Sequence, residues 1–471
     1  MFKDKVAIVL VVLTVAICVF TAPRFCYSGD PYWMRLQAWS WLHGRGDVPY
    51  DESISKERGQ YCFYNERDGK YYSKYGVMNS VFFMAPVVIY NMVGGYGCSE
   101  DSDRLFVAVS NGFNLLWAIS LALILYKTAL LFTEDNYLAA LWAWLNLFSG
   151  FGWNYLRAQT GEIFQWTLAS VLFYLLFRFI REREDKRIVA GIWLSLFLLI
   201  LNKSVYVLFL PIWIVLCFVL NRTELKKINF WYPLIVICFI FLSLNYWRFG
   251  SPFNNGYSQW NHEANLFGGN IFEGIYGFLF SSDRSIFIHY PILLISLVAW
   301  KKFYREYKDE SLLTLGVFLL FLLVNSKFIS WAGHWCYGPR FLLFILAQMS
   351  LPSLCLFDYI RSHWNKISVK LSVVPLILIL GSSFYLQIQV NSLNFFTYYQ
   401  VESCLRSVGA TRALEEYHRL PFGVINVQLN NFKEKGTPPH WLNTAYEEAP
   451  GTAWGLSQTL HKFIEKNYFW F

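Results

Sequence analysis

The sequence predicts an all-α, polytopic membrane protein, a bundle of about eleven transmembrane helices with twelve as the open alternative. Of the 471 residues, 55% are apolar and only 15% are charged, whereas a soluble domain carries about 25% charged residues. Uncharged apolar runs recur along most of the chain, and a helix needs roughly 17 to 25 such residues to cross a bilayer. These observations exclude a disordered chain, a disulfide-stapled miniprotein and a free soluble enzyme.

Eleven segments are predicted to span the membrane. They are residues 6–22, 105–126, 137–150, 162–177, 188–201, 205–220, 230–247, 288–300, 311–324, 341–356 and 371–390. None contains Lys, Arg or Asp, and the only acidic residue is Glu162 at the start of its span. Because a charge in the middle of the bilayer is costly, this absence of charge supports the assignments.

The distribution of Lys and Arg predicts the orientation. If residues 1–5 are cytoplasmic, the inner segments are 1–5, 127–136, 178–187, 221–229, 301–310 and 357–370. Lys and Arg are about three times as dense there as in the outer segments 23–104, 151–161, 202–204, 248–287 and 325–340. The positive-inside rule therefore predicts a cytoplasmic N-terminus and an extracytoplasmic C-terminal domain, residues 391–471, with helices over 410–419 and 453–468. The inner segments also explain the net charge of +8, so no nucleic acid is expected as a partner.

One further apolar run, residues 77–93, is long enough to cross the bilayer. If it did, every later segment would change sides, and the basic runs 178–187 and 301–308 would face outward, against the positive-inside rule. We therefore expect a juxtamembrane or re-entrant helix that begins and ends on the outer side. Pro86 and the closing Gly94-Gly95 agree with such an element. A true twelfth span is the alternative.

Polar and aromatic residues gather in the outer segments, close to the ends of the spans. The stretches with this placement are residues 29–33 and 69–76, both within 24–76, and residues 157–162, 202–204, 249–257, 281–284 and 331–340. A transporter more often places its ionisable residues near the middle of the bilayer, on broken helices. The pattern therefore indicates a catalyst that works at the boundary between lipid and water.

Four of these stretches, taken in order, resemble the GT-C glycosyltransferases, especially the bacterial relatives of the protein O-mannosyltransferase and aminoarabinose-transferase group. The stretches are Gly29-Asp30, Tyr71-Tyr72-Ser73-Lys74-Tyr75-Gly76, the Phe-Gly-Ser-Pro-Phe…Gly-Tyr loop of 249–257, and the Trp-Ala-Gly-His-Trp…Tyr-Gly-Pro-Arg loop of 331–340. The resemblance covers roughly residues 1–390 and implies a catalytic membrane module whose large outer loop, 23–104, bears juxtamembrane helices. It also implies transfer of a sugar from a polyprenyl-phosphate carrier to a glycan, lipid or protein acceptor outside the cytoplasm, in a bacterial inner membrane.

The sequence departs from the family pattern at two places. Many of these enzymes have a second acidic residue in or near the segment that here reads Ser73-Lys74-Tyr75. They also commonly have two prolines ahead of the second helix, where this chain has Tyr75-Gly76-Val77. A site with two carboxylates is therefore not supported in this segment.

Asp30 is the candidate general base. It follows the first span by about eight residues, lies between Gly29 and Pro31, and resembles the catalytic acidic residue of the family. Direct displacement at a sugar needs a base that accepts the proton of the acceptor. The structural alternative is an Asp that caps a helix or a turn, a common use of Asp before Pro.

Three cations are candidates to bind the phosphate of the donor lipid: Lys74, Arg340 and, less strongly, Lys203. Arg offers a bidentate fork and Lys a point charge on a flexible stem. Lys74 directly precedes an apolar helix, where backbone N–H groups could also meet a phosphate. The alternative for each is an interfacial cation whose stem packs on apolar surface and whose charge reaches water.

A second group of candidates could contact the sugar or the acceptor. Its members, polar or aromatic residues of the outer segments, are Glu162, His334, Trp331, Trp335 and Tyr72. The indole face packs well on the C–H face of a pyranose, but tryptophans are also common in membrane interfaces. For Glu162 the structural alternative is a favourable carboxylate in the first turn of a helix.

No cofactor is expected, and no spacing of Cys, His or carboxylates resembles a metal site. The expected partners are membrane lipid, a polyprenyl-phosphate-linked sugar and the acceptor. The competing interpretations are a lipid or solute transporter and a non-catalytic membrane scaffold.

Overall fold

The computed structural model describes residues 4–23, 29–49, 61–95, 103–182, 185–219, 230–259, 265–282, 284–333, 336–392, 396–420, 425, 428–429, 431–432 and 435–449. The amino-terminal half contains α1 (Lys5–Phe20), α2 (Asp30–Leu42), β1 (Cys62–Asn65), β2 (Lys70–Ser73), α4 (Val77–Met92), α5 (Arg104–Ala129), α6 (Asn136–Phe148), α7 (Gly152–Arg157), α8 (Gly161–Arg181), α9 (Lys186–Asn202), the 3-10 helix η1 (Ser204–Leu208) and α10 (Phe209–Val219). The remainder contains α11 (Tyr232–Phe249), α12 (Ile271–Phe280), α13 (Ile286–His289), α14 (Ile292–Glu306), α15 (Lys308–Lys327), η4 (Arg340–Leu342), α16 (Leu343–Met349), α17 (Pro352–Ser362), α18 (Ile367–Ser392), α19 (Phe396–Ser407), α20 (Thr411–Arg419) and α22 (His440–Glu448).

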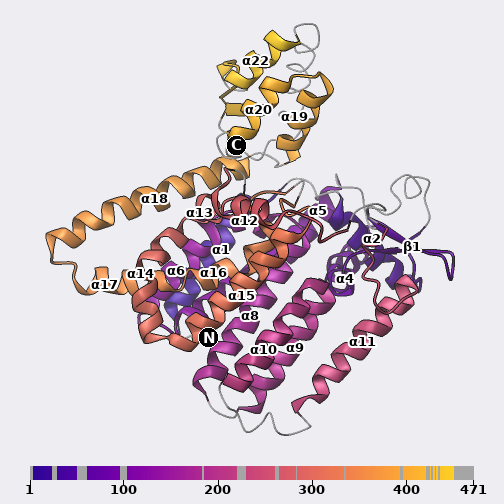
Figure 1. Ribbon diagram of the computed structural model, residues 1–471, viewed down its shortest axis with the longest axis horizontal. Coiled ribbons are helices and arrows are strands. Elements are labelled where there is room, and N and C mark those ends of the chain that lie inside the picture. The colour runs from indigo at the N-terminus through magenta and orange to yellow at the C-terminus, as the bar shows by residue number, and fades with distance from the viewer. Residues whose placement is uncertain are drawn as a thin grey trace.

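The predicted fold class is confirmed, because a bundle of apolar helices forms most of the molecule (Figure 1). Six helical segments in the described ranges are long and apolar enough to cross a bilayer: α5, α8, α11, α15, residues 340–362 and α18. The other apolar helices, such as α1 and α10, are shorter. The all-α expectation was wrong in one detail, since β1 and β2 pair as an antiparallel hairpin within the first large loop.

Proline interrupts two of the predicted spans. The segment predicted over 288–300 is divided into α13 and α14 at Tyr290-Pro291, and the segment over 341–356 is divided into α16 and α17 before Pro352. Proline has no N–H and its ring clashes with the preceding turn, so it is accepted at the start of a helix and kinks or breaks many helix interiors, although Pro86 and Pro375 remain inside α4 and α18. The apolar character of these segments was predicted correctly from the sequence, but the division of each into two helices was not predicted.

Contacts at the helix ends agree with the predicted alternation of the spans. At one end of the bundle, Tyr126 in the last turns of α5 donates to Asp4 before α1, with 2.6 Å between Oη and Oδ2. At the same end, Arg181 at the end of α8 pairs with Glu310 at the start of α15 at 2.8 Å. At the opposite end, Asn111 near the start of α5 donates to the carbonyl of Pro23, which follows α1. This second end, where α1 and α9 finish and α5 and α8 begin, is called the cavity end below. Which end faces the cytoplasm stays a prediction.

Helix α4 begins and ends at the cavity end. Near its start, the Asn79 amide donates to the carbonyl of Asn202 at the end of α9, at 2.8 Å. Near its finish, the Tyr90 hydroxyl donates to Asp103, the residue that caps the start of α5, at 2.5 Å. A helix that crossed the bilayer would place these two contacts at opposite ends of the bundle. The structure therefore agrees with a juxtamembrane helix over residues 77–93.

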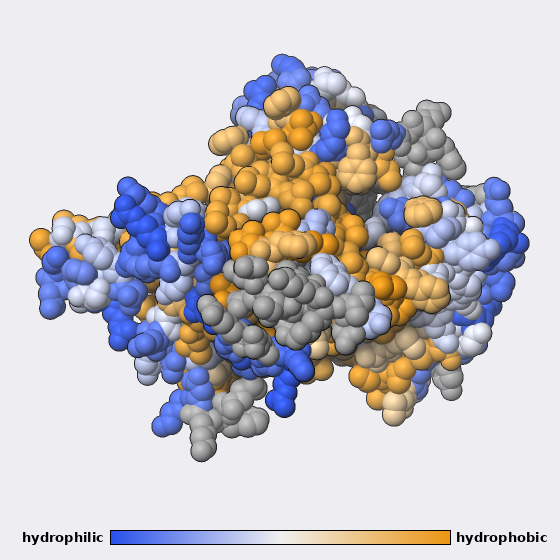
Figure 2. All heavy atoms as spheres, turned by 60° about the horizontal axis from the view of Figure 1, so that its bottom comes forward, coloured by the Kyte–Doolittle hydropathy of each residue, from blue (hydrophilic) through white to orange (hydrophobic). Residues whose placement is uncertain are grey.

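The outer surface of the bundle is apolar. Large hydrophobic side chains of α11 and α18 are exposed, among them Phe239 at 70% and Leu378 at 65%. Figure 2 shows apolar residues over much of the middle of one face of the molecule, with hydrophilic residues on either side. A soluble protein rarely exposes an apolar area of this extent, so the surface fits contact with lipid tails.

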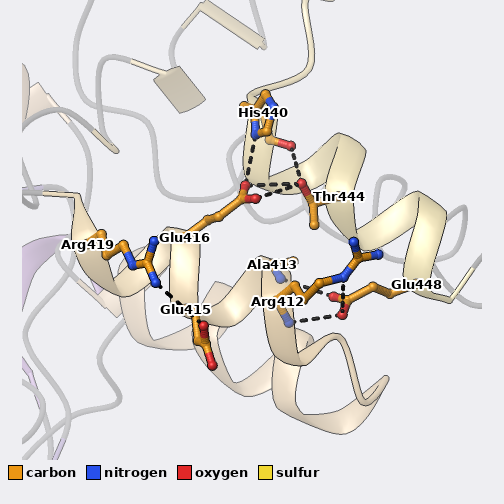
Figure 3. A network of polar contacts seen from close by, with 8 residues as sticks. All are labelled: Arg412, Ala413, Glu415, Glu416, Arg419, His440, Thr444 and Glu448. Carbon is orange, nitrogen blue, oxygen red and sulfur yellow. Dashed lines mark hydrogen bonds and ion pairs between the residues drawn. The ribbon is translucent and has the colours of Figure 1, made fainter.

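The helices α19, α20 and α22 lie together beyond the end of α18 (Figure 1). Glu448 accepts hydrogen bonds from the backbone N–H groups of Arg412 and Ala413, at 2.9 and 3.0 Å, and so caps the start of α20 from another helix (Figure 3). Glu416 lies 2.9 Å from Nδ1 of His440. These hydrogen bonds lower the pKa of both carboxyl groups. The helix predicted over 410–419 is confirmed as α20, and the one over 453–468 lies outside the described residues.

Candidate active site

A cavity of about 760 Å³ opens at the cavity end of the bundle. Residues from α2, the β2–α4 connection, α8, the end of α9, α11 and the start of η4 line it. The carboxylates and cations of its described lining are two and four in number: Asp30, Glu162, Lys74, Lys203, Arg248 and Arg340. Five of these six are candidates that the sequence predicted, and they come from segments far apart in the chain.

Asp30 lies in the wall of this cavity, at the start of α2. The preceding Gly29 has φ of +76°, a conformation that glycine adopts readily, and Pro31 occupies a position in the first turn where proline is favoured. The carboxylate oxygen Oδ1 accepts a hydrogen bond from the hydroxyl of Tyr75. Asp30 therefore is the first residue of α2 and lines the cavity, whereas the helix is capped by Gly29 and not by the Asp30 side chain, as the structural alternative would require.

Lys74 enters the cavity from the end of β2. Its neighbour Ser73 donates its backbone N–H to the side chain of Gln37 in α2, at 3.1 Å, which ties the hairpin to the helix that carries Asp30. The Lys74 ammonium lies 5.1 Å from the ring centre of Tyr257 and 5.5 Å from that of Tyr75. Burial lowers the pKa of Lys74 to about 8, although Asp30 acts in the opposite direction.

The α4–α9 junction fixes the distance between Lys74 and Lys203. The Asn79 and Asn202 side chains are hydrogen-bonded at 2.8 Å, and Asn79 also donates to the backbone carbonyl of Asn202. Gly76 packs directly against the same carbonyl. The junction is therefore a close approach of two backbones, with Lys74 two residues before it and Lys203 directly after it.

We expect Gly76→Ala to destabilise the fold strongly at this junction. A Cβ atom at residue 76 would lie 1.9 Å from the carbonyl oxygen of Asn202 and 2.5 Å from that of Leu201. Backbone atoms cannot move aside as a flexible side chain can, so the free energy of unfolding should fall by about 3 kcal/mol. Thermal unfolding in detergent measures this loss. Gly112→Ala in α5 is the matched control, because nothing lies within 4 Å of a Cβ added at residue 112. An unfolding temperature for Gly76→Ala equal to that of the control would contradict the close packing.

Arg340 and Lys203 both line the cavity and lie near one aromatic ring, that of Phe341. The Phe341 ring centre lies 4.5 Å from the Lys203 ammonium and 5.1 Å from the Arg340 guanidinium carbon. Arg340 also pairs with Glu162 at 3.4 Å. Burial lowers the pKa of Lys203 to about 8, and the nearby Arg340 lowers it further. Two cations thus remain close because a ring and a carboxylate offset their repulsion.

Arg248, Tyr75 and Tyr257 were missing from the sequence-based candidates. Arg248 is buried near the end of α11 and donates to the backbone carbonyls of Ser73 and Tyr75, the latter at 2.8 Å. It therefore binds the strand-to-helix connection from the far side of the cavity. Its signal in the sequence was an Arg at the end of an apolar run, which is also the pattern of an ordinary interfacial cation.

The structure does not bring Tyr72 or Trp331 into the cavity. The Tyr72 hydroxyl donates to Asp68 at 2.7 Å, and its ring packs against Trp247. Trp331 packs against Phe278 of α12, with ring centres 5.6 Å apart. His334 and Trp335 lie outside the described residues.

The lining is suited to binding an anion. Its four cations and two carboxylates, all taken from the described part of the cavity wall, leave an excess of two positive charges. In the described ranges, no three His, Cys, Asp or Glu side chains lie together as metal ligands do. The independence from metal stays a prediction.

Comparison with solved structures shows two similar folds. The archaeal oligosaccharyltransferase AglB from Archaeoglobus fulgidus, solved with an inhibitory peptide and a dolichol-phosphate, has a TM-score of 0.54 and 14% identity, over 89% of this chain and 60% of that one. ArnT from Cupriavidus metallidurans, in the apo state, has a TM-score of 0.50 and 14% identity, over 98% of this chain and 77% of that one. The chain thus spans about 60% of the length of AglB. No protein-family model and no curated protein sequence matches it. Both structures have the GT-C fold, so the predicted resemblance is confirmed at the level of the fold.

Proposed function

We propose that the chain is a membrane glycosyltransferase that transfers a sugar from a polyprenyl-phosphate carrier to a glycan, lipid or protein acceptor outside the cytoplasm. One observation carries the proposal: Asp30, Lys74, Lys203 and Arg340, from four separate segments, line a single cavity at one end of a helical bundle with a GT-C fold. A bound dolichol-phosphate in AglB supports a lipid phosphate as the donor group.

The proposed reaction is a direct displacement. The acceptor oxygen attacks C1 of the sugar, and the bond between C1 and the phosphate oxygen breaks with both electrons leaving on the phosphate. The proton of the acceptor passes to the Asp30 carboxylate, which acts as the general base. The Tyr75 hydroxyl occupies Oδ1 of Asp30, so Oδ2 remains for the acceptor.

The charge of the cavity favours the products of this reaction. The donor is a phosphodiester with one negative charge, whereas the released lipid phosphate carries about −1.5 to −2 at neutral pH. The cations of the lining therefore interact more strongly with the phosphate as the bond to the sugar breaks. Interactions that strengthen between the ground state and the transition state are those that accelerate a reaction. Lys74, Lys203 and Arg340 are proposed to provide them.

The Glu162 carboxylate is proposed to position Arg340. It holds the Arg340 guanidinium through one nitrogen, Nη1. Arg340 lines the cavity, and its guanidinium has further N–H donors besides the one that Glu162 accepts, so these are proposed to bind a phosphate oxygen. Glu162 thereby orients Arg340 toward the donor, and its remaining oxygen can accept from a sugar hydroxyl.

A transfer assay with purified protein tests the proposal. The protein is given a polyprenyl-phosphate carrier bearing a radiolabelled sugar, together with candidate acceptors, and the release of lipid phosphate is followed. We expect release of lipid phosphate coupled to appearance of label in the acceptor. A transporter, the competing interpretation, would move the labelled lipid between vesicle leaflets without cleaving it. Movement without any cleavage across glycan, lipid and protein acceptors would contradict a transferase.

A further inference from the structure

Tyr75 occupies a position between the two groups that the proposed reaction uses. Only 6% of this residue is exposed. Its hydroxyl donates to Asp30, and its ring centre lies 5.5 Å from the Lys74 ammonium. The proposed general base and a proposed phosphate-binding cation are thus both in contact with one side chain.

The position of this ring does not depend on its hydroxyl. Arg248 donates to the backbone carbonyl of Tyr75 at 2.8 Å. On the other side, Gly76 packs against the carbonyl of Asn202. Since the backbone is held at both places, removal of the hydroxyl should leave the ring beside Lys74.

We infer that Tyr75 is a positioning residue for transfer, whose hydroxyl orients the Asp30 carboxylate and whose ring holds the Lys74 ammonium toward the donor phosphate. The inference rests on the proposed function. A hydrogen bond to a carboxylate stabilises its charged form, and the face of an aromatic ring stabilises an adjacent ammonium. Burial raises the pKa of Tyr75 well above its usual value, and the negative charge of Asp30 raises it further, so the hydroxyl stays a donor at neutral pH.

Other charged groups also act on Asp30. Lys74, Lys203 and Arg340 interact with it electrostatically, as does the hydroxyl of Tyr257. These groups remain in place when the Tyr75 hydroxyl is lost. The loss is therefore expected to lower the rate of transfer without abolishing transfer.

The test compares Tyr75→Phe with Tyr75→Leu and with the wild-type protein. In Tyr75→Phe, kcat should fall by about tenfold, because the carboxylate is no longer held in place, while donor affinity stays within about twofold. In Tyr75→Leu, which also lacks the ring, donor affinity should fall in addition, by about fivefold. Tyr72→Phe is the matched control, because the Tyr72 hydroxyl also donates to an aspartate but outside the cavity.

The outcomes separate this inference from the proposed function. Transfer by the wild-type protein together with an unchanged kcat in Tyr75→Phe would overturn the role of Tyr75 alone. An equal loss of kcat in Tyr72→Phe would overturn it as well, because the effect would then be structural. Absence of transfer by the wild-type protein would overturn the proposed function and, with it, any part of Tyr75 in transfer.

Discussion

Sugar transfer by the Asp30→Asn protein is expected to fall by about 10²- to 10⁴-fold, the usual contribution of a general base. Asparagine has the size of aspartate and keeps an oxygen that can accept the Tyr75 hydroxyl, so the start of α2 should be unchanged. It cannot take the proton of the acceptor. Donor affinity should be maintained, because the change removes a negative charge from a cavity that binds a phosphate. The measurements are kcat and the dissociation constant of the donor.

Two further variants make this result decisive. Asp68→Asn is the matched control, because Asp68 also accepts a tyrosine hydroxyl, that of Tyr72, but lies exposed on the hairpin turn. Its transfer rate should equal that of the wild type. Glu162→Gln tests the other carboxylate of the cavity. Transfer that survives in Asp30→Asn and disappears in Glu162→Gln would assign the base to Glu162 and reject Asp30.

Much of the candidate site could be predicted from the sequence because the membrane restricts where charge can lie. Asp30, Glu162, Lys203 and Arg340 are each at or near the end of an apolar run, and the positive-inside rule assigned these ends to one side. Residues on one side and at similar depth can differ only in their lateral position. The number of arrangements is therefore small, and a single cavity that contains all four is among the simplest.

The lateral packing could not be predicted in the same way. Each strand of the hairpin β1–β2 has only four residues, so the alternation of side chains is too short to predict which tyrosine contacts which aspartate. Tyr72 donates to Asp68, and Tyr75, which follows β2, donates to Asp30. Arg248 contacts Ser73 and Tyr75, more than 170 residues earlier in the chain. Such a contact follows from the packing of the hairpin against α11, and the local sequence contains no trace of it.

The same limit explains why Trp331 was predicted to bind sugar although it packs against α12. Its indole lies where a side chain on Gly277 would be, since a Cβ at residue 277 would come within 2.0 Å of the ring. The sequence showed an aromatic residue in an outer segment and, separately, a helix with two glycines. Only the tertiary structure shows that the glycine makes room for the tryptophan.

Donor affinity is expected to decrease steeply as the pH rises above about 8. Burial lowers the pKa of both Lys74 and Lys203 to about 8, so in the free protein each ammonium is present below this pH and is lost above it. The protonated fraction of each lysine falls about tenfold for each pH unit above 8. If both cations bind the phosphate, the logarithm of the donor affinity should fall by about two per pH unit between pH 8.5 and 9.5, because donor binding must then return two protons.

The variant Lys74→Arg distinguishes the contribution of Lys74 to this pH dependence from that of Lys203. The guanidinium stays charged at these pH values, so in Lys74→Arg the slope should fall from about two to about one. Lys70→Arg, an exposed position on β2, is the matched control and should keep the wild-type slope.

In the absence of donor, the lowered pKa values of Lys74 and Lys203 predict the opposite trend for stability. The unfolded lysines hold more protons than the folded ones between pH 8 and about 10.5, so the free energy of unfolding should rise with pH across that window.

A donor affinity that does not change from pH 7 to 9.5 would exclude both lysines from the phosphate site and leave Arg340 as the single proposed contact.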